Sequence, residues 1–367
     1  MILTQHSLSF FKDFPLVVKI MWLLVILFSL VIIVLVFYLK IIRRRLRKKE
    51  VARVEYISKC EQYVVDYLFT NEEGEGISKA QKKIIRKLKR GLFLNSKRKL
   101  TVHVLIKLLG EISGEMTNSV RQLYIELGLL KQAKAKLKHR LWHIVAIGIR
   151  DLRMLKIEEV HQEISKHINH PKLEVRRQAH LYFISVFGYK GLDFLDKLDS
   201  DISLWDQIGF LEILGNIDNQ EIPSLKKWLY SSNDYVVLFT IQLVKFYGRI
   251  ENKEALLQLI NHENAEIRFA VIKVLNYLYI DEAKEPLIKM YSTLTNKEQI
   301  TVFKLLENMA SKEDEFFVLK HLNNVNFEIK LVAIKILKKI NTVKFEEFKI
   351  NNEDTSCKEI IRFIENN

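Results

Sequence analysis

The sequence is poor in the residues that end or bend a chain. Its 367 residues include only 12 glycines and 4 prolines, whereas sheet-rich folds and glycine-dependent nucleotide-binding folds need turn residues at a far higher density. It has two cysteines, Cys60 and Cys357, which are too few for a disulfide framework or a four-cysteine metal site. Because 49% of the residues are hydrophobic, wholesale disorder is excluded. The composition favours helices joined by short turns.

Motifs that carry chemistry are also missing. The sequence contains no G-x-x-x-x-G-K-[ST], G-x-G-x-x-G or H-E-x-x-H. His139 and His143 have the spacing of two metal ligands on a helix, but Arg140 lies between them and no carboxylate is nearby. A surface or interface pair is therefore favoured over a metal site. No local arrangement singles out a nucleophile or an acid–base pair, so we predict no catalytic residue, no metal, no cofactor and no enzyme activity.

One long apolar run is present. The 20 residues from Ile20 to Leu39 carry no charge, and a helix of this length spans about 30 Å, the thickness of a bilayer's hydrocarbon core. Trp22 and Tyr38 lie near its two ends, where aromatic side chains suit the membrane interfaces. A cleaved signal peptide has a shorter apolar stretch and an A-x-A-like exit. We expect an uncleaved transmembrane anchor over 16–40 and a short extracytoplasmic tail over 1–15.

A basic block follows this run directly. Seven lysines and arginines lie within residues 40–49, against Lys12 and Lys19 before the run, so the positive-inside rule places the C-terminal domain in the cytoplasm. The block either binds anionic lipid headgroups, at about 1 kcal/mol per basic residue, or only fixes the topology; we favour the second interpretation. The residues concerned are Arg43, Arg44, Arg45, Arg47, Lys48 and Lys49.

The region over 41–99 is predicted as basic juxtamembrane helices. Helical spacing of apolar residues continues over 41–69, and the glycines and glutamates of 70–78 mark a linker. A second basic stretch over 79–99 has the pattern of an amphipathic helix. Such a helix either lies on the membrane surface or packs its apolar side on the first helical repeat.

From about residue 100 to 350 the chain reads as short helical segments that recur with a fixed period, about 31 residues long. The apolar anchors of three segments are Val175, Ile267 and Ile329. The first two are separated by about three periods, and the last two by about two periods. Each anchor begins a stripe, in which a small residue lies four positions after the anchor and an apolar residue lies eight positions after it. The copy near residue 298 is degraded. The predicted stripes are Val175/Ala179/Phe183, Trp205/Gly209/Ile213, Val236/Thr240/Val244, Ile267/Val271/Leu275 and Ile329/Ala333/Leu337.

Three of these segments resemble the second helix of HEAT repeats: HPKLEVRRQA from His170, HENAEIRFAV from His262 and FEIKLVAIKIL from Phe327. The period is similar to that of the compact HEAT-like repeats of bacterial proteins, and the resemblance covers roughly 140–345. Together with the apolar run, it predicts an all-α protein with one N-terminal transmembrane helix followed by an α-solenoid over 100–350, capped by 351–367. Bacterial proteins of this plan look like adaptors at the inner membrane, some of them tied to cell-surface polysaccharide synthesis.

The net charge of +14 is unevenly distributed: residues 40–100 contribute +12, residues 131–156 contribute +7, and residues 157–367 contribute −5. The basic block over 131–156 is not needed to fix the topology, and it suggests a surface for an acidic protein or for the membrane. The absence of a nucleic-acid motif makes nucleic acid the weaker choice. The residues of this surface are Lys134, Lys136, Lys138, Arg140, Trp142, Arg150 and Arg153.

A basic residue recurs directly after the repeat anchors, as Arg176, Arg268 and Lys330. These residues either form a ladder for an acidic partner or bind turn carbonyls and an acidic neighbour in the next repeat, and we favour the structural role. Taken together, the sequence predicts a membrane-anchored, non-enzymatic scaffold for a membrane-associated protein partner. The alternative is an anionic-lipid-binding protein that organises the membrane.

Overall fold

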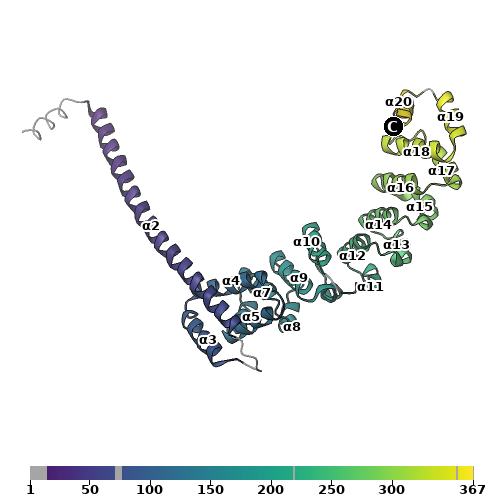
Figure 1. Cartoon of the computed structure of the whole chain (residues 1–367). Coiled ribbons are helices and arrows are strands. Elements are labelled where there is room, and N and C mark those ends of the chain that lie inside the picture. Colours follow the sequence, from purple (N-terminus) through teal and green to yellow (C-terminus); the bar gives the residue numbers. More distant parts are fainter. Residues whose placement is uncertain (1–14, 71–76, 218–219, 353, 367) are drawn as a thin grey trace, which may run out of the picture. The chain divides into compact units, whose positions relative to one another are not determined.

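The computed structural model describes residues 15–70, 77–217, 220–352 and 354–366. Within these ranges every regular element is a helix (Figure 1), which confirms the predicted all-α fold. The chain forms two compact units, residues 1–132 and 133–367. The predicted tail over 1–15 lies outside the described residues apart from Pro15, and so does most of the linker over 70–78.

The first unit is dominated by α2 (Leu16–Phe69), a single helix of 54 residues. It is the one helix of the described residues that is long and apolar enough to cross a membrane, and its most apolar stretch is not buried by other elements. The predicted anchor over 16–40 and the predicted helix over 41–69 are therefore one continuous helix.

The C-terminal part of α2 packs against α3 (Lys79–Gly91), α4 (Asn95–Glu111) and α5 (Glu115–Glu126). The stretch over 79–99, expected as one basic helix, forms α3 and the start of α4. The apolar side of α3, with Ile85 and Leu88, is buried, and this helix packs on α2 and not on a helical repeat. Gln81 joins the two helices, because its amide donates to the Tyr67 carbonyl at 3.1 Å.

The second unit is a series of helix pairs, and α6 (Leu129–Leu137) crosses the boundary that precedes it. The first helices of the pairs are short and partly 3₁₀: α8 (His161–Ser165), η1 (Gly188–Lys197), α11 (Lys226–Leu229), η2 (Ile250–Asn252) with α13 (Lys253–Leu259), η3 (Asp281–Ala283) with α15 (Lys284–Lys289) and η4 (Tyr291–Thr293), η5 (Lys312–Asp314) with α17 (Glu315–Lys320), and α19 (Thr342–Asn351).

The second helices are longer: α7 (Trp142–Met154), α9 (Leu173–Phe187), α10 (Leu204–Gly215), α12 (Asp234–Tyr247), α14 (Ala265–Tyr277), α16 (Asn296–Met309), α18 (Phe327–Ile340) and α20 (Thr355–Asn366). From α7 to α18 each of them packs on the next, and we call the helices of this series the second-helix layer (Figure 1). One continuous core of buried side chains runs from Ile168 to Ile364. The second unit is thus an α-solenoid, as predicted.

Repeated capping residues start the second helices. Ser203, Asn233, Asn264, Thr295 and Asn326 are the N-caps of five of them, and each side-chain oxygen accepts a hydrogen bond from a backbone N–H of the first turn. Such a cap satisfies a donor that the helix leaves unpaired. All three asparagines also donate to the preceding repeat: Asn233 to the Leu198 carbonyl at 2.7 Å, Asn264 to Asp234 at 2.6 Å and Asn326 to Asn296 at 3.0 Å. The caps therefore set both the helix starts and the contacts between repeats.

The predicted apolar stripes are buried in α12, α14 and α18, but the stripe assigned to α10 is wrong by one residue. Trp205 is 77% exposed, and the buried stripe of α10 is Asp206, Phe210 and Leu214. In the degraded copy near residue 298 the buried anchor is also an acid, Glu298. In both repeats the anchor is an acid that accepts a hydrogen bond from its own Ser or Thr cap. A search for apolar anchors misses an acid in this position.

The C-terminal end of the solenoid is covered by α20, which packs against α18. Its buried residues are Cys357, Ile360, Ile361 and Ile364. This helix lies in the segment 351–367 that was predicted as a cap, of which residues 353 and 367 lie outside the described structure.

Candidate functional site

A groove of about 630 Å³ opens on the second-helix layer, between α12, α14, α16 and the start of α18. Four lysines line it: Lys245, Lys273, Lys297 and Lys304. Among the described lining residues Glu328 is the one acid. We call this feature the lysine groove. It carries a strong positive charge although the sequence around it, residues 157–367, is acidic overall.

Aromatic rings hold three of these lysines in place. The Lys245 Nζ lies 5.3 Å from the centroid of the Tyr277 ring, and the Nζ atoms of Lys273 and Lys297 lie 4.9 and 4.1 Å from that of Phe269. A cation–π contact orders an ammonium group without neutralising it. None of the three lysines forms an ion pair with a carboxylate of the described residues. Their charge therefore remains available to a ligand.

The remaining polar groups of the lysine groove are partly paired with each other. Lys304 Nζ lies 3.1 Å from a Glu328 carboxylate oxygen. The Asn308 side-chain amide donates to the Asn276 side-chain oxygen at 2.8 Å. The groove thus offers three ammonium groups without a carboxylate partner, one that is shared, and amides that can accept or donate further hydrogen bonds.

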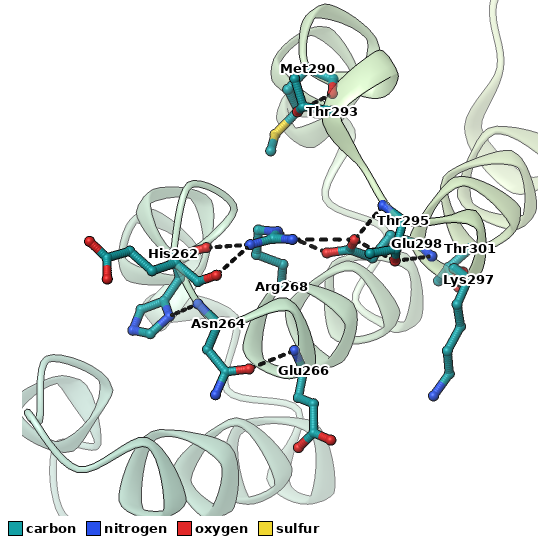
Figure 2. Close-up of polar contacts among 11 residues, drawn as sticks. His262, Asn264, Glu266, Arg268, Met290, Thr293, Thr295, Lys297, Glu298 and Thr301 are labelled. Atoms are coloured by element: carbon teal, nitrogen blue, oxygen red, sulfur yellow. Dashed lines mark hydrogen bonds and ion pairs between the residues drawn. The ribbon is translucent and has the colours of Figure 1, made fainter.

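An ion pair joins α14 and α16, the helices that carry Phe269 and Lys297 (Figure 2). Arg268 donates to the carbonyls of His262 and Glu263, both at 2.8 Å, and to a Glu298 carboxylate oxygen, also at 2.8 Å. Because Phe269 follows Arg268 and Lys297 precedes Glu298, this pair connects the two helices next to the positions of Phe269 and Lys297. Figure 2 shows Lys297 pointing away from the pair.

Glu298 is 1% exposed, yet it is held as a carboxylate. Burial raises the pKa of this group, but hydrogen bonds from Thr295 and Arg268 outweigh burial and lower the pKa below its ordinary value. The Thr295 hydroxyl donates to the carboxylate at 2.6 Å and the Thr295 N–H at 2.8 Å. The buried charge is therefore fully hydrogen-bonded.

The other two predicted repeat positions make comparable contacts. Arg176 donates to the His170 carbonyl at 3.1 Å and to Asp201 at 2.5 Å. Lys330 lies 3.2 Å from an Asp354 carboxylate oxygen. At all three positions the charge is engaged inside the solenoid, and none of the three lines the lysine groove.

The basic surface predicted over 131–153 is partly compensated. Lys136 and Arg150 both pair with the buried carboxylate of Asp151, at 2.8 and 3.2 Å. Lys134 pairs with Glu163 at 3.2 Å. These three residues therefore have less charge to offer a partner than the sequence suggests.

The rest of that surface divides into exposed and half-buried residues. Arg153 is half-buried, and burial lowers its pKa. Lys138, Arg140 and Trp142 are exposed, and within the described chain neither basic group has an ion pair. With Arg150, four of the seven predicted residues are thus exposed, and none is buried.

The basic residues of the first unit are exposed on two helices. All six candidates from Arg43 to Lys49 are exposed on α2. The exposed basic residues of α3 are Lys79, Lys82, Lys83, Arg86, Lys87, Lys89 and Arg90.

The basic block of α2 and Lys87 of α3 are far apart when both positions are measured along the axis of α2. Lys87 Nζ lies 5.2 Å from the centroid of the Tyr63 ring, and Tyr63 is near the C-terminal end of α2. The rise of an α-helix separates Tyr63 from Leu39, the end of the apolar run, by about 36 Å. This separation is several times the Debye length of about 8 Å at physiological salt. An upright α2 therefore places Lys87 beyond the reach of the lipid headgroups, whereas the C-terminal end of α3 lies nearer to them, because Gly91 approaches the Tyr56 side chain.

The lysine groove was not predicted from the sequence, although the sequence contains a signal for it. Lys273, Lys304 and Lys335 recur at one repeat period and stand at the same offset after three successive repeat anchors. A search for apolar stripes and for the basic residue after each anchor does not test this offset. The pairing of Phe269 with Lys297 has no such signal, because neither residue recurs at its repeat position.

No cluster of three or more His, Cys, Asp or Glu side chains that could hold a metal ion occurs in the described ranges. Both cysteines are buried. His139 and His143 lie on either side of the start of α7, so they do not share one helix as the sequence suggested.

No family model and no curated protein matches this sequence. Among solved structures, an engineered protein matches with 16% identity, covering 84% of this chain and 98% of its own, at a TM-score of 0.36. Human deoxyhypusine hydroxylase in complex with glycerol matches with 12% identity, 79% and 97% coverage and a TM-score of 0.28. The CpcE–CpcF complex of phycocyanin lyase from a Nostoc species matches with 11% identity, 80% and 96% coverage and a TM-score of 0.24. At such TM-scores the fold assignment rests on the helix pairs themselves.

Proposed function

We propose that this protein is a membrane-anchored, non-enzymatic scaffold that presents its solenoid to a protein partner at the cytoplasmic face of the inner membrane. The lysine groove is the observation that carries this proposal. It is a positively charged hollow on a continuous layer of helices, and stacked helix pairs provide surfaces of this kind for binding other proteins.

The membrane part of the proposal rests on α2. Its apolar section is long enough to span a bilayer, and the exposed block from Arg43 to Lys49 follows that section directly. The positive-inside rule then places the solenoid in the cytoplasm as part of a single-pass protein. Anchoring raises the local concentration of the solenoid for partners in the same membrane. Machinery for cell-surface polysaccharide synthesis is the candidate that the HEAT-like resemblance favours.

The test is a pull-down of the tagged full-length protein from gently solubilised membranes, with bound proteins identified by mass spectrometry. We expect one near-stoichiometric protein partner, whose chemistry would identify the pathway. Recovery of only lipid and background proteins at several salt concentrations would remove the support for a stable scaffold.

The second candidate function is binding of anionic lipid. The observation that favours it is the exposed basic side of α3 together with the basic block of α2. The separation of about 36 Å along α2 weighs against Lys87 taking part.

A further inference from the structure

We infer that the lysine groove binds an extended, acidic segment of the partner protein. This inference rests on the proposed function and specifies the chemistry of the partner. Lys245, Lys273 and Lys297 come from three consecutive second helices, α12, α14 and α16. They have no carboxylate partner among the described residues, so an acidic ligand would supply the missing charge.

The spacing of the lysines suits a peptide in an extended conformation. Packed helices lie about 8–10 Å apart, and a chain in the extended polyproline II conformation rises about 3.1 Å per residue with three residues per turn. Acidic side chains at every third residue therefore share one face of the chain and advance by about one helix of the layer. The aromatic rings and Ile300 add an apolar lining for the side chains between them.

The contacts that the aromatic rings make with lysines favour a peptide ligand over single-stranded nucleic acid. Grooves for single strands combine basic residues with aromatic rings on which the bases stack. In the lysine groove the Phe269 ring is contacted by two ammonium groups and the Tyr277 ring by one. The rings serve to position lysines, and this role leaves less of their faces for a base.

The test uses the full-length protein in nanodiscs of uncharged lipid and a fluorescein-labelled peptide of four Glu-Ser-Leu repeats, with binding measured by fluorescence anisotropy. The controls are a peptide of four Gln-Ser-Leu repeats and a twelve-nucleotide oligothymidylate. The variant Lys245→Gln/Lys273→Gln/Lys297→Gln removes the three charges. The matched variant Lys166→Gln/Lys190→Gln/Lys226→Gln removes three exposed charges of the second unit that do not line the groove.

We expect the acidic peptide to bind the wild type, the glutamine peptide to bind at least tenfold more weakly, and the groove variant to lose at least about tenfold in affinity. The matched variant should change the affinity by less than threefold. Phe269→Leu keeps every charge but removes the ring, and should weaken binding by about two- to fivefold.

Three results would overturn the inference: no binding of the acidic peptide, equal losses in the two triple variants, or tighter groove-dependent binding of the oligothymidylate. Circular dichroism of each variant shows whether it is folded. The pull-down separates this inference from the proposed function. A protein partner that the groove variant retains would leave the scaffold role intact and disprove the groove as its binding site.

Discussion

At the scale of single residues, the solenoid uses buried acids in places where a repeat normally has an apolar anchor. Asp206 and Glu298 are 5% and 1% exposed, and each has a basic partner from the preceding second helix, Arg177 and Arg268. A buried charge is tolerated only when it is paired and hydrogen-bonded. These pairs therefore act as specific joints between neighbouring repeats.

The joint at Arg268 leads to a prediction of stability. Arg268→Met leaves Glu298 buried without its cation, and we expect the free energy of unfolding to fall by about 3 kcal/mol. The double variant Arg268→Met/Glu298→Gln removes the charge as well and should recover more than half of this loss. Urea unfolding followed by circular dichroism at pH 7 measures both. Equal instability of the single and double variants would show that the buried charge is not the cause.

The same joint gives this prediction a pH dependence. In the wild type the pKa of Glu298 lies below the ordinary value of 4.5, so its stabilising contribution is complete above pH 4.5 and is lost as the pH falls through the folded-state pKa. Without Arg268, burial shifts the pKa upward and the acid takes up a proton more readily. The difference between wild type and Arg268→Met should therefore be smaller at pH 4 than at pH 7.

At the scale of elements, the connection from α9 to η1 depends on a close backbone approach. A Cβ atom added to Gly191 would lie 2.1 Å from the Phe183 carbonyl oxygen, so η1 can fold back on α9 only with glycine at this position. Gly209 in α10 is the opposite case, since a Cβ atom there would meet nothing within 4 Å. Gly209 was predicted as the small residue of the α10 stripe, and it does not lie in the buried stripe because that stripe is displaced by one residue.

These two glycines form a matched pair for mutagenesis. Gly191→Ala should lower the free energy of unfolding by about 3 kcal/mol because the backbone must shift. Gly209→Ala should raise it by about 0.5–1 kcal/mol, since alanine loses less conformational entropy than glycine in a helix. Thermal unfolding by circular dichroism distinguishes the two. A neutral Gly191→Ala would mean that η1 and α9 separate easily.

What the sequence predicts of these elements depends on repetition. The helical class and the long helix α2 follow from composition, and the stripes of α12, α14 and α18 follow from the repeat period. The lysine groove combines side chains from four second helices, and only the recurrence of Lys273, Lys304 and Lys335 at one offset is visible in the sequence. The cation–π contacts that order three of its lysines depend on packing between repeats, which the sequence pattern does not contain.

At the scale of the whole molecule, the continuity of α2 decides between the two candidate functions. A straight helix that leaves the membrane at Leu39 holds Arg43 about 6 Å and the site of α3 contact at Tyr63 about 36 Å from the end of the apolar run. The first set of charges then meets the headgroups and the second faces the cytoplasm. Lipid binding by Lys87 would require α2 to lie along the membrane surface.

This arrangement is tested by fluorescence quenching in nanodiscs that contain a lipid with a contact quencher on its headgroup. Arg43→Cys and Lys87→Cys each introduce an exposed thiol for a fluorophore, while the native Cys60 and Cys357 are buried. We expect strong quenching at position 43 and almost none at position 87, because contact quenching cannot reach across about 36 Å. An aqueous quencher provides the control and should reach both dyes. Strong lipid quenching at both positions would place α3 on the membrane and would favour the lipid-binding function over the scaffold.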